Sequence, residues 1–266
     1  MGQGVNLNDR DVLVEILRSI DAGSSVCVAT VVRTSRSVPR GPGSKMLVYS
    51  DGQTRGTIGG GEMESRVVAE ALSCLSAREP RLCTYQLLDP RNGDPGVCGG
   101  EVTVSLEPFM PTPTVYVIGC GHVGKAVVEL AHWMGFRVIA TDDRPGLANT
   151  ENLPLADETI SGPITDAIGA FPITDETHIV VVTRNMGIDV GLLPHLFETN
   201  ARSIGVMGSK RRWHETCAAL LAQGMSASDL DRVIAPIGIE LHAETPEEIA
   251  VSILAEIVAL RRTPRA

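Results

Sequence analysis

Gly119, Gly121 and Gly124 form a Gly-x-Gly-x-x-Gly turn, and Asp142 follows the first of them by 23 residues. Glycines at this spacing permit a tight turn and close approach of the backbone to a pyrophosphate. An acid about 20 residues later can accept a hydrogen bond from a ribose hydroxyl. Arg144, two residues further on, could instead favour a 2′-phosphate. The pattern therefore predicts a dinucleotide site, with the choice between NAD and NADP left open.

The elements around this turn are those that a nucleotide site needs. An apolar strand at 115–118 runs into the glycines, a helix follows, and a second strand at 136–140 leads to the acid. A helix that begins at such a turn directs its N–H groups and the positive end of its dipole toward an anion. A glycine-rich turn in some other βαβ unit is the alternative, but this order of elements favours a Rossmann-type half.

Three further segments combine positive charge with exposed backbone donors or a helix start. Between Arg33 and Arg55 there are five cations (Arg33, Arg36, Arg40, Lys45 and Arg55) and a single acid. Gly59-Gly60-Gly61 precedes a helix, and Gly208-Ser209-Lys210-Arg211-Arg212 opens another. Any one of them could be a solvated face or a simple turn. Four such features in a chain of net charge −9 favour a phosphate-bearing ligand.

Cys98 lies in the sequence Gly96-Val97-Cys98-Gly99-Gly100, a loop that precedes a strand. Neighbours with little bulk leave such a thiol open to a reagent or a metal, whereas a cysteine within an apolar run is typical of packing. We therefore interpret Cys98 as the candidate catalytic thiol and metal ligand, with inert packing as the alternative.

Periodicity and turn residues divide the chain into domains 1–110 and 114–266, joined by a stiff proline-containing linker. The first is predicted to be a small α/β domain. Its helices are expected at 8–22 and 62–77, and its strands at 25–32, 45–49, 53–58, 81–87 and 101–107. A single core is plausible for a domain of about a hundred residues.

The second domain continues the α/β rhythm and predicts a doubly wound parallel sheet of Rossmann type. Further strands are expected at 178–183 and 203–207, and helices at 188–199, 208–223 and 245–262. The last helix begins with a capping box, Thr245-Pro246-Glu247-Glu248, and carries an apolar face that includes Val258. That face could pack on the sheet or on a second protomer, and we predict a homodimer.

Composition and charge argue against several classes of function. A net charge of −9 provides no positive field for nucleic acid. The longest run without charge, 108–124, is broken by prolines and glycines, so we expect no membrane helix. Acids near the start argue against a signal peptide. Six scattered cysteines without a C-x-x-C pair favour reduced thiols in a cytoplasmic protein.

Several motifs, taken in order, resemble one known family over nearly the whole chain. They are Ser37-Val38-Pro39-Arg40 with Lys45-Met46, Gly56-Thr57-Ile58-Gly59-Gly60-Gly61 with Glu62 or Glu64, Cys98-Gly99-Gly100, the Gly119 turn with His122, Asp142-Asp143-Arg144, Gly208-Ser209-Lys210-Arg211, Ala235-Pro236-Ile237-Gly238, and the helix from Thr245. The chain resembles the XdhC/CoxI family of accessory factors for xanthine dehydrogenase and related molybdenum hydroxylases. Cys120 and Arg36 stand where alanine and glycine are commoner in that family.

The resemblance implies a protein that binds the molybdenum cofactor, a pyranopterin phosphate. Such a protein holds the cofactor while a cysteine desulfurase supplies sulfur, and then inserts it into the apo-hydroxylase. An NAD(P)-dependent oxidoreductase is the alternative, and a carrier without chemistry is a third hypothesis. The expected cofactor-binding residues are Arg40, Lys45, Gly59, Gly60, Gly61, Glu62, Gly99, Gly100, Gly119, Gly121, His122, Gly124, Asp142, Arg144, Gly208, Ser209, Lys210 and Arg211.

Overall fold

The computed structural model describes residues 7–88 and 98–262. The chain forms two compact units, Met1–Pro111 and Thr112–Ala266. Within the described ranges, no helix is long and apolar enough to cross a membrane.

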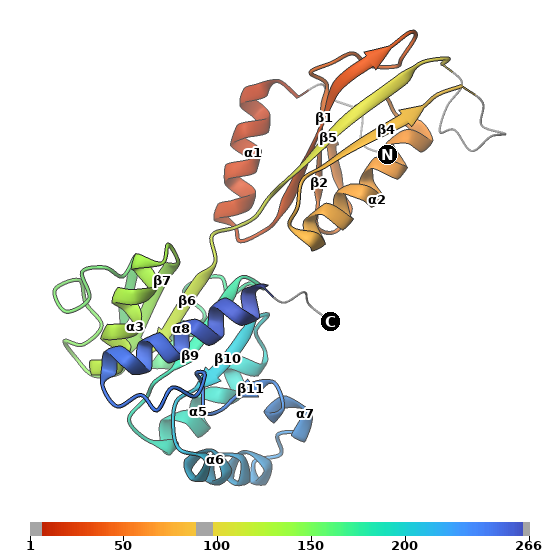
Figure 1. Ribbon diagram of the computed structural model, residues 1–266. Coiled ribbons are helices and arrows are strands. Elements are labelled where there is room, and N and C mark those ends of the chain that lie inside the picture. Colours follow the sequence, from red (N-terminus) through yellow and green to blue (C-terminus); the bar gives the residue numbers. More distant parts are fainter. Residues whose placement is uncertain (1–6, 89–97, 263–266) are drawn as a thin grey trace. The chain divides into compact units, whose positions relative to one another are not determined.

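The N-terminal unit is an antiparallel five-stranded sheet with a helix on each face (Figure 1). Its elements in chain order are α1 (Asp9–Asp21), β1 (Val26–Ser35), β2 (Lys45–Tyr49), β3 (Thr54–Gly56), α2 (Gly61–Ala77), β4 (Arg81–Gln86) and β5 (Glu101–Phe109). Across the sheet the strands run β3-β2-β1-β5-β4. Because side chains alternate along a strand, Val26 and Val28 of β1 pack toward α1, whereas Cys27 and Ala29 pack toward α2.

The C-terminal unit is a six-stranded parallel sheet covered by helices. Its elements are β6 (Thr114–Ile118), α3 (His122–Trp133), β7 (Arg137–Asp142), β8 (Glu158–Ser161), α4 (Ile164–Ile168), β9 (Thr177–Val181), α5 (Met186–Phe197), β10 (Ser203–Val206), α6 (Lys210–Ala222), α7 (Ala227–Leu230), β11 (Val233–Ile234) and α8 (Pro246–Arg262). Helices α3 and α8 cover one face, and α5 and α6 the other. Strands β6 and β9 are buried along their whole length, as expected for parallel strands covered on both sides.

The strand order β11-β10-β9-β6-β7-β8 is that of a doubly wound Rossmann sheet. The chain runs outward from β6 to β7 and β8 on one side, and then returns to β9 on the other. The order therefore reverses between β6 and β9, and ligands of such sheets bind outside the carboxyl ends of the strands at this point.

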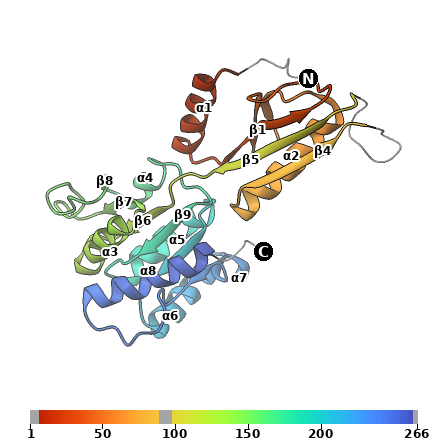
Figure 2. The same cartoon turned by 45° about the horizontal axis from the view of Figure 1, so that its top comes forward.

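Helix α8 uses most of its apolar face inside its own unit. It packs against α3, side by side with it in both views (Figures 1 and 2), and Ile253, Leu254 and Ile257 are buried. Val258, predicted to face inward, is 36% exposed. Most of the apolar face that suggested a homodimer is therefore buried within this unit, and the homodimer stays a prediction.

Candidate functional site

The glycine turn after β6 combines tight packing with an open backbone. A Cβ on Gly124 would lie only 1.9 Å from the carbonyl oxygen of Gly119. A Cβ on Gly119 itself, where φ is 109°, would lie 2.7 Å from the carbonyl oxygen of Val182. Gly121 differs, because the nearest atom to a Cβ there would be Arg144 Nη2 at 3.9 Å. Packing thus requires glycine at 119 and 124, and Gly121 leaves room for the close approach that a pyrophosphate needs.

Helix α3 begins at this turn, with Gly121 as its N-cap and His122 as its first residue. No side chain caps the helix, and His122 is exposed. The first N–H groups and the positive end of the helix dipole are therefore available to an anion.

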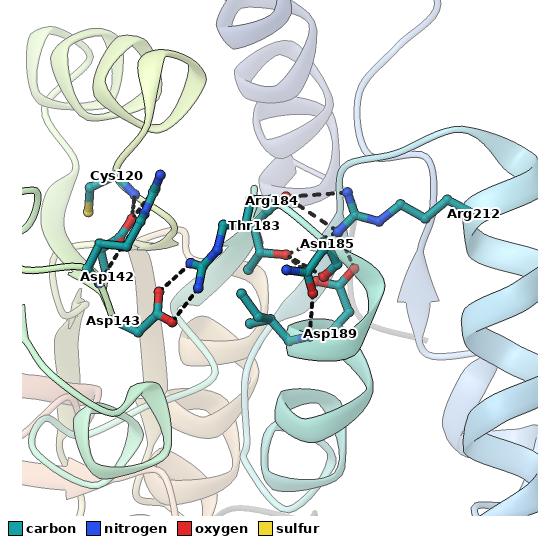
Figure 3. A network of polar contacts seen from close by, with 10 residues as sticks. Cys120, Asp142, Asp143, Thr183, Arg184, Asn185, Asp189 and Arg212 are labelled. Atoms are coloured by element: carbon teal, nitrogen blue, oxygen red, sulfur yellow. Dashed lines mark hydrogen bonds and ion pairs between the residues drawn. The ribbon is translucent and has the colours of Figure 1, made fainter.

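Asp142, the predicted ribose acceptor, is 1% exposed and already hydrogen-bonded on both oxygens (Figure 3). The Cys120 N–H donates to Oδ2 at 2.7 Å. Arg144 donates its backbone N–H and its Nε–H to Oδ1, both at 2.9 Å, and its Nη2–H to Oδ2 at 2.7 Å. A carboxylate offers about four acceptor positions, and these four bonds use them. In this structure Asp142 therefore anchors the glycine turn and the Arg144 guanidinium, and its contact with a ribose stays a prediction.

The same contacts determine the charge of this group. Burial raises the pKa of Asp142, but the bonds from Arg144 and Cys120 outweigh burial and lower the pKa below its ordinary 3.8. Burial and the neighbouring Asp142 carboxylate raise the pKa of the Cys120 thiol to about 12. At neutral pH the site therefore holds an ionised Asp142 beside a neutral Cys120 thiol.

A second ion pair, for which no role was predicted, lies beside the first. Arg184 Nη1 donates to Asp143 Oδ1 at 2.6 Å, and its Nη2 donates to Oδ2 at 2.8 Å. Asp143 directly follows β7, and Arg184 lies three residues after β9. Two consecutive acids after a strand were the only sequence signal for this pair.

In the segment that follows β10, Arg211 and Arg212 make different contacts. Ser209 caps α6 by accepting from the Arg212 N–H at 3.2 Å. Lys210 is exposed, and Arg211 forms a surface pair with Glu215, its Nε lying 3.0 Å from Oε1. Of the predicted anion-binding groups here, Ser209 therefore serves the helix and Arg211 already has a carboxylate partner.

Arg212, which was not assigned to the site, turns inward to a buried cluster with Thr183 and Asp189 (Figure 3). Its Nη2 donates to Asp189 and, at 3.1 Å, to the Thr183 hydroxyl, which itself donates to Asp189. Its Nη1 donates to the Thr183 carbonyl oxygen at 3.3 Å. The cluster links the end of β9 to the starts of α5 and α6. An acid within the otherwise apolar start of α5 was the available signal.

In the N-terminal unit, the protein's own Glu64 fills the predicted anion loop 59–61. Its Oε1 accepts from the Thr57 hydroxyl and from the N–H groups of Ile58, Gly59 and Gly60, the three N–H distances being 2.8, 3.1 and 2.8 Å. Donors predicted for a ligand phosphate therefore have an internal partner. An acid in the first turn of a helix can reach back to the loop that enters it, as here.

Glu62, the acid that was assigned to this loop, instead pairs with Arg66 one turn later, at 2.6 Å on the surface. Glu64 remains charged in its place. Burial raises the pKa of Glu64, but the bonds from Thr57 and the loop N–H groups outweigh burial and lower the pKa below its ordinary 4.5.

The cations between 33 and 55 do not act as one group. Lys45 Nζ lies 2.9 Å from Asp9 Oδ1, and Arg55 pairs with Glu15, so α1 neutralises two of the five. Arg33 and Arg36 are exposed, and Arg40 is half-buried.

Cys98 is exposed at the start of the segment that leads into β5. The Gly99 N–H donates to the Leu87 carbonyl at 2.7 Å, and the Leu87 N–H donates to the Gly100 carbonyl at 2.8 Å. A Cβ on Gly100 would lie 2.3 Å from the Ser37 carbonyl oxygen, so only glycine permits this contact. The thiol is accessible while the backbone next to it is tightly held.

Three of the motifs behind the resemblance meet here. A Cβ on Gly100 would also lie 2.8 Å from Val38 Cγ1, and one on Gly59 would lie 3.0 Å from Pro39 Cβ. The 37–40 segment therefore lies between the Gly59 loop and the Cys98–Gly100 segment. We take this place, with its exposed thiol, as the candidate site of the N-terminal unit.

All six cysteines lie in the described ranges and are free thiols. Cys27 and Cys74 are buried in the core, and burial raises the pKa of Cys27 to about 12. In the part of the chain that the structure describes, His, Cys, Asp and Glu side chains form no group of three or more able to hold a metal ion.

Replacing Glu64 by alanine is expected to destabilise the N-terminal unit by about 1–3 kcal/mol, because it leaves several polar donors of the loop without an acceptor. The exposed Glu62 offers a matched control, and Glu62→Ala should change stability by less than about 1 kcal/mol. Because the folded pKa of Glu64 is lowered, its stabilisation is full above the unfolded value of 4.5 and is lost as pH falls through the folded value. Urea unfolding at neutral and acid pH measures both effects. Equal losses in the two variants would contradict the assigned role of Glu64.

The comparisons with known proteins match both units. A family model described as the XdhC Rossmann domain matches residues 115–257. A second, described as the XdhC and CoxI family, matches residues 19–86. The chain belongs to the XdhC/CoxI family. The resemblance stated from the motifs is thereby confirmed.

Relatives of this XdhC-family chain include both uncharacterised and named proteins. It is 31% identical over 255 residues to the uncharacterised protein YqeB of Escherichia coli K12, covering 94% of this chain and 46% of YqeB. It is 32% identical over 157 residues to a probable xanthine dehydrogenase subunit of Bacillus subtilis 168, covering 59% of this chain and 46% of that protein. The chain thus spans about half the length of these two relatives.

A more distant relative is the molybdenum cofactor insertion chaperone PaoD of Escherichia coli K12. The identity is 21% over 281 residues, which cover 95% of this chain and 88% of PaoD. Among solved structures, one from Bacillus halodurans described as a xanthine dehydrogenase aligns with a TM-score of 0.52 and 22% identity, covering 97% of each chain. That likeness confirms the fold of this XdhC-family chain.

Proposed function

We propose that this chain is a maturation factor for the molybdenum cofactor. In this proposal it binds the cofactor, holds it while a cysteine desulfurase supplies the terminal sulfur, and inserts it into xanthine dehydrogenase or a related molybdenum hydroxylase. This cofactor maturation takes place in the cytoplasm.

The observation that carries the proposal is the meeting of three family motifs beside the exposed Cys98. A molybdenum centre binds soft ligands, of which a thiolate is one. A sulfur atom in transit needs a nucleophilic thiolate to carry it. Both roles need a thiol that can be approached closely. Cys98 is exposed and its neighbour Gly100 is packed, which fixes the backbone without covering the thiol. The family membership and the name of the relative PaoD support the same role.

The Rossmann unit supplies a phosphate-binding turn in this proposal. The available N-terminus of α3 and the open backbone at Gly121 favour a phosphate group. NAD(P)-dependent hydride transfer is a weaker candidate, because Asp142, which would accept from the ribose of NAD, already accepts four hydrogen bonds.

Cys98→Ala is expected to lower cofactor transfer about 10- to 100-fold, the range typical when a group that supports a metal centre is lost. The measurement is reconstitution of an apo-hydroxylase with molybdenum cofactor, cysteine desulfurase and this chain. Stability should change little, because the residue is exposed.

Cys217→Ala is the matched control, because Cys217 is a half-buried thiol of the other unit. Cys27 and Cys74 are less suitable, since both are buried and their removal would leave cavities. Full activation by the Cys98→Ala protein would exclude a chemical role for this thiol.

A further inference from the structure

Two arginine–aspartate pairs flank the glycine turn at the carboxyl edge of the Rossmann sheet. One joins Arg144 to Asp142. The other, labelled in Figure 3, joins Arg184 to Asp143. The four groups form one electrostatic cluster, since the charge of Arg184 acts on Arg144 and that of Asp142 acts on Asp143. With two cations and two anions the cluster is neutral overall.

The two pairs differ in how firmly the aspartate is held. Asp142 is buried and also accepts from the Cys120 N–H, so its carboxylate belongs to the fold. Asp143 is half-exposed, and the side-chain bonds to its carboxylate come from the Arg184 guanidinium. The second pair can therefore be exchanged without rearranging the sheet.

The Arg184–Asp143 pair also crosses the strand that carries the glycine turn. Arg184 follows β9 and Asp143 follows β7, and these strands pair with β6 from opposite sides. Neighbouring strands lie about 4.8 Å apart, so the pair connects chain ends about 10 Å apart beyond β6. A ligand phosphate at the switch point approaches the edge that this pair spans.

We propose that Arg184 is a phosphate-binding residue of the Rossmann unit, and that Asp143 occupies its guanidinium until a phosphate-bearing ligand replaces the carboxylate. An arginine fork recognises a carboxylate and a phosphate with the same two-bond geometry. Arg144, held by Asp142 beside Gly121, provides a second cation that stays in place. The ligand class is a phosphate or diphosphate ester. This inference rests on the phosphate-binding role proposed above for the Rossmann unit.

Asp143→Asn tests the exchange, because it keeps the shape of the side chain and removes the competing charge. Titration calorimetry of the full chain with inorganic pyrophosphate should show binding about three- to fivefold tighter than in the parent, the size of an exposed ion pair. Arg184→Ala should weaken binding by a similar factor. In the Arg184→Ala background, Asp143→Asn should lose most of its gain, because the two residues act on one another.

Glu158→Gln is the matched control for net charge. Glu158 lies at the start of β8, at the opposite end of the sheet, where it forms a loose pair with Arg137. The Glu158→Gln substitution removes the same charge as Asp143→Asn and should leave pyrophosphate affinity unchanged.

Three results would overturn the inference. Parental affinity in Asp143→Asn would show that the carboxylate does not compete, and an equal gain in Glu158→Gln would reduce the effect to net charge. A full gain of Asp143→Asn in the Arg184→Ala background would exclude Arg184 as the acting group. In all three the parent still binds pyrophosphate, so the phosphate-binding turn would stand. If neither the parent nor Asp143→Asn binds pyrophosphate, both the phosphate-binding role of the glycine turn and the exchange at Arg184 are excluded. The result of the Cys98 reconstitution does not depend on that outcome.

Discussion

Gly124→Ala is expected to destabilise the Rossmann unit by about 3 kcal/mol or more, at the upper end of the cost of overpacking. The new Cβ would lie 1.9 Å from the Gly119 carbonyl oxygen and 2.9 Å from its carbonyl carbon. The obstacle is backbone, and Gly119 is itself packed against the Val182 carbonyl. Helix α3 could relieve the clash only by moving away from the sheet. Urea unfolding followed by circular dichroism measures the loss.

Gly121→Ala is the matched control within the same motif. Gly121 has φ −72°, which any residue adopts, and a Cβ there would approach nothing closer than 3.9 Å. The unfolding midpoint of Gly121→Ala should remain near that of the parent, whereas a larger side chain at position 121 should weaken phosphate binding. An unchanged midpoint for Gly124→Ala would refute the packing role of the third glycine.

Arg212→Ala should cost about 3–5 kcal/mol, the usual loss when one partner of a buried ion pair is removed. Asp189 is 0% exposed, and Arg212 is its cationic partner. Without the guanidinium, a buried carboxylate would keep only the Thr183 hydroxyl among its present side-chain partners. The link between the end of β9 and the start of α6 would be lost with it.

The preceding arginine gives the control. Arg211 is 89% exposed and pairs with a half-exposed Glu215, so Arg211→Ala should cost less than about 1 kcal/mol. Thermal unfolding of both variants makes the comparison. Similar losses at 211 and 212 would mean that the buried cluster contributes little to stability.

The elements with strong periodicity were predictable. Helix α1 was expected at 8–22 and lies at Asp9–Asp21, with Asn8 as its N-cap. Strand β2 has the predicted bounds. The short elements β8, α4, α7 and β11 were not predicted, because two to five residues carry too little periodicity. Their place is decided by the neighbouring strands and helices on which they pack.

The candidate site was predictable as motifs but not as contacts. The spacing of Gly119, Gly121 and Gly124 was enough to predict the turn. That Glu64 fills the Gly59 loop, or that Asp142 holds Arg144, depends on which side chains compete for the same donors once the chain has folded. Sequence spacing does not express such competition.

The position of β5 has a consequence for the order in which the N-terminal unit can be completed. This strand is the last of its unit to leave the ribosome, yet it lies between β1 and β4 and pairs with both. Until it docks, β4 has no neighbour in the sheet, and Gly100 cannot reach the 35–38 segment. The Cys98 thiol therefore reaches its final setting only in a chain synthesised beyond Phe109, and a growing or truncated chain would lack that setting.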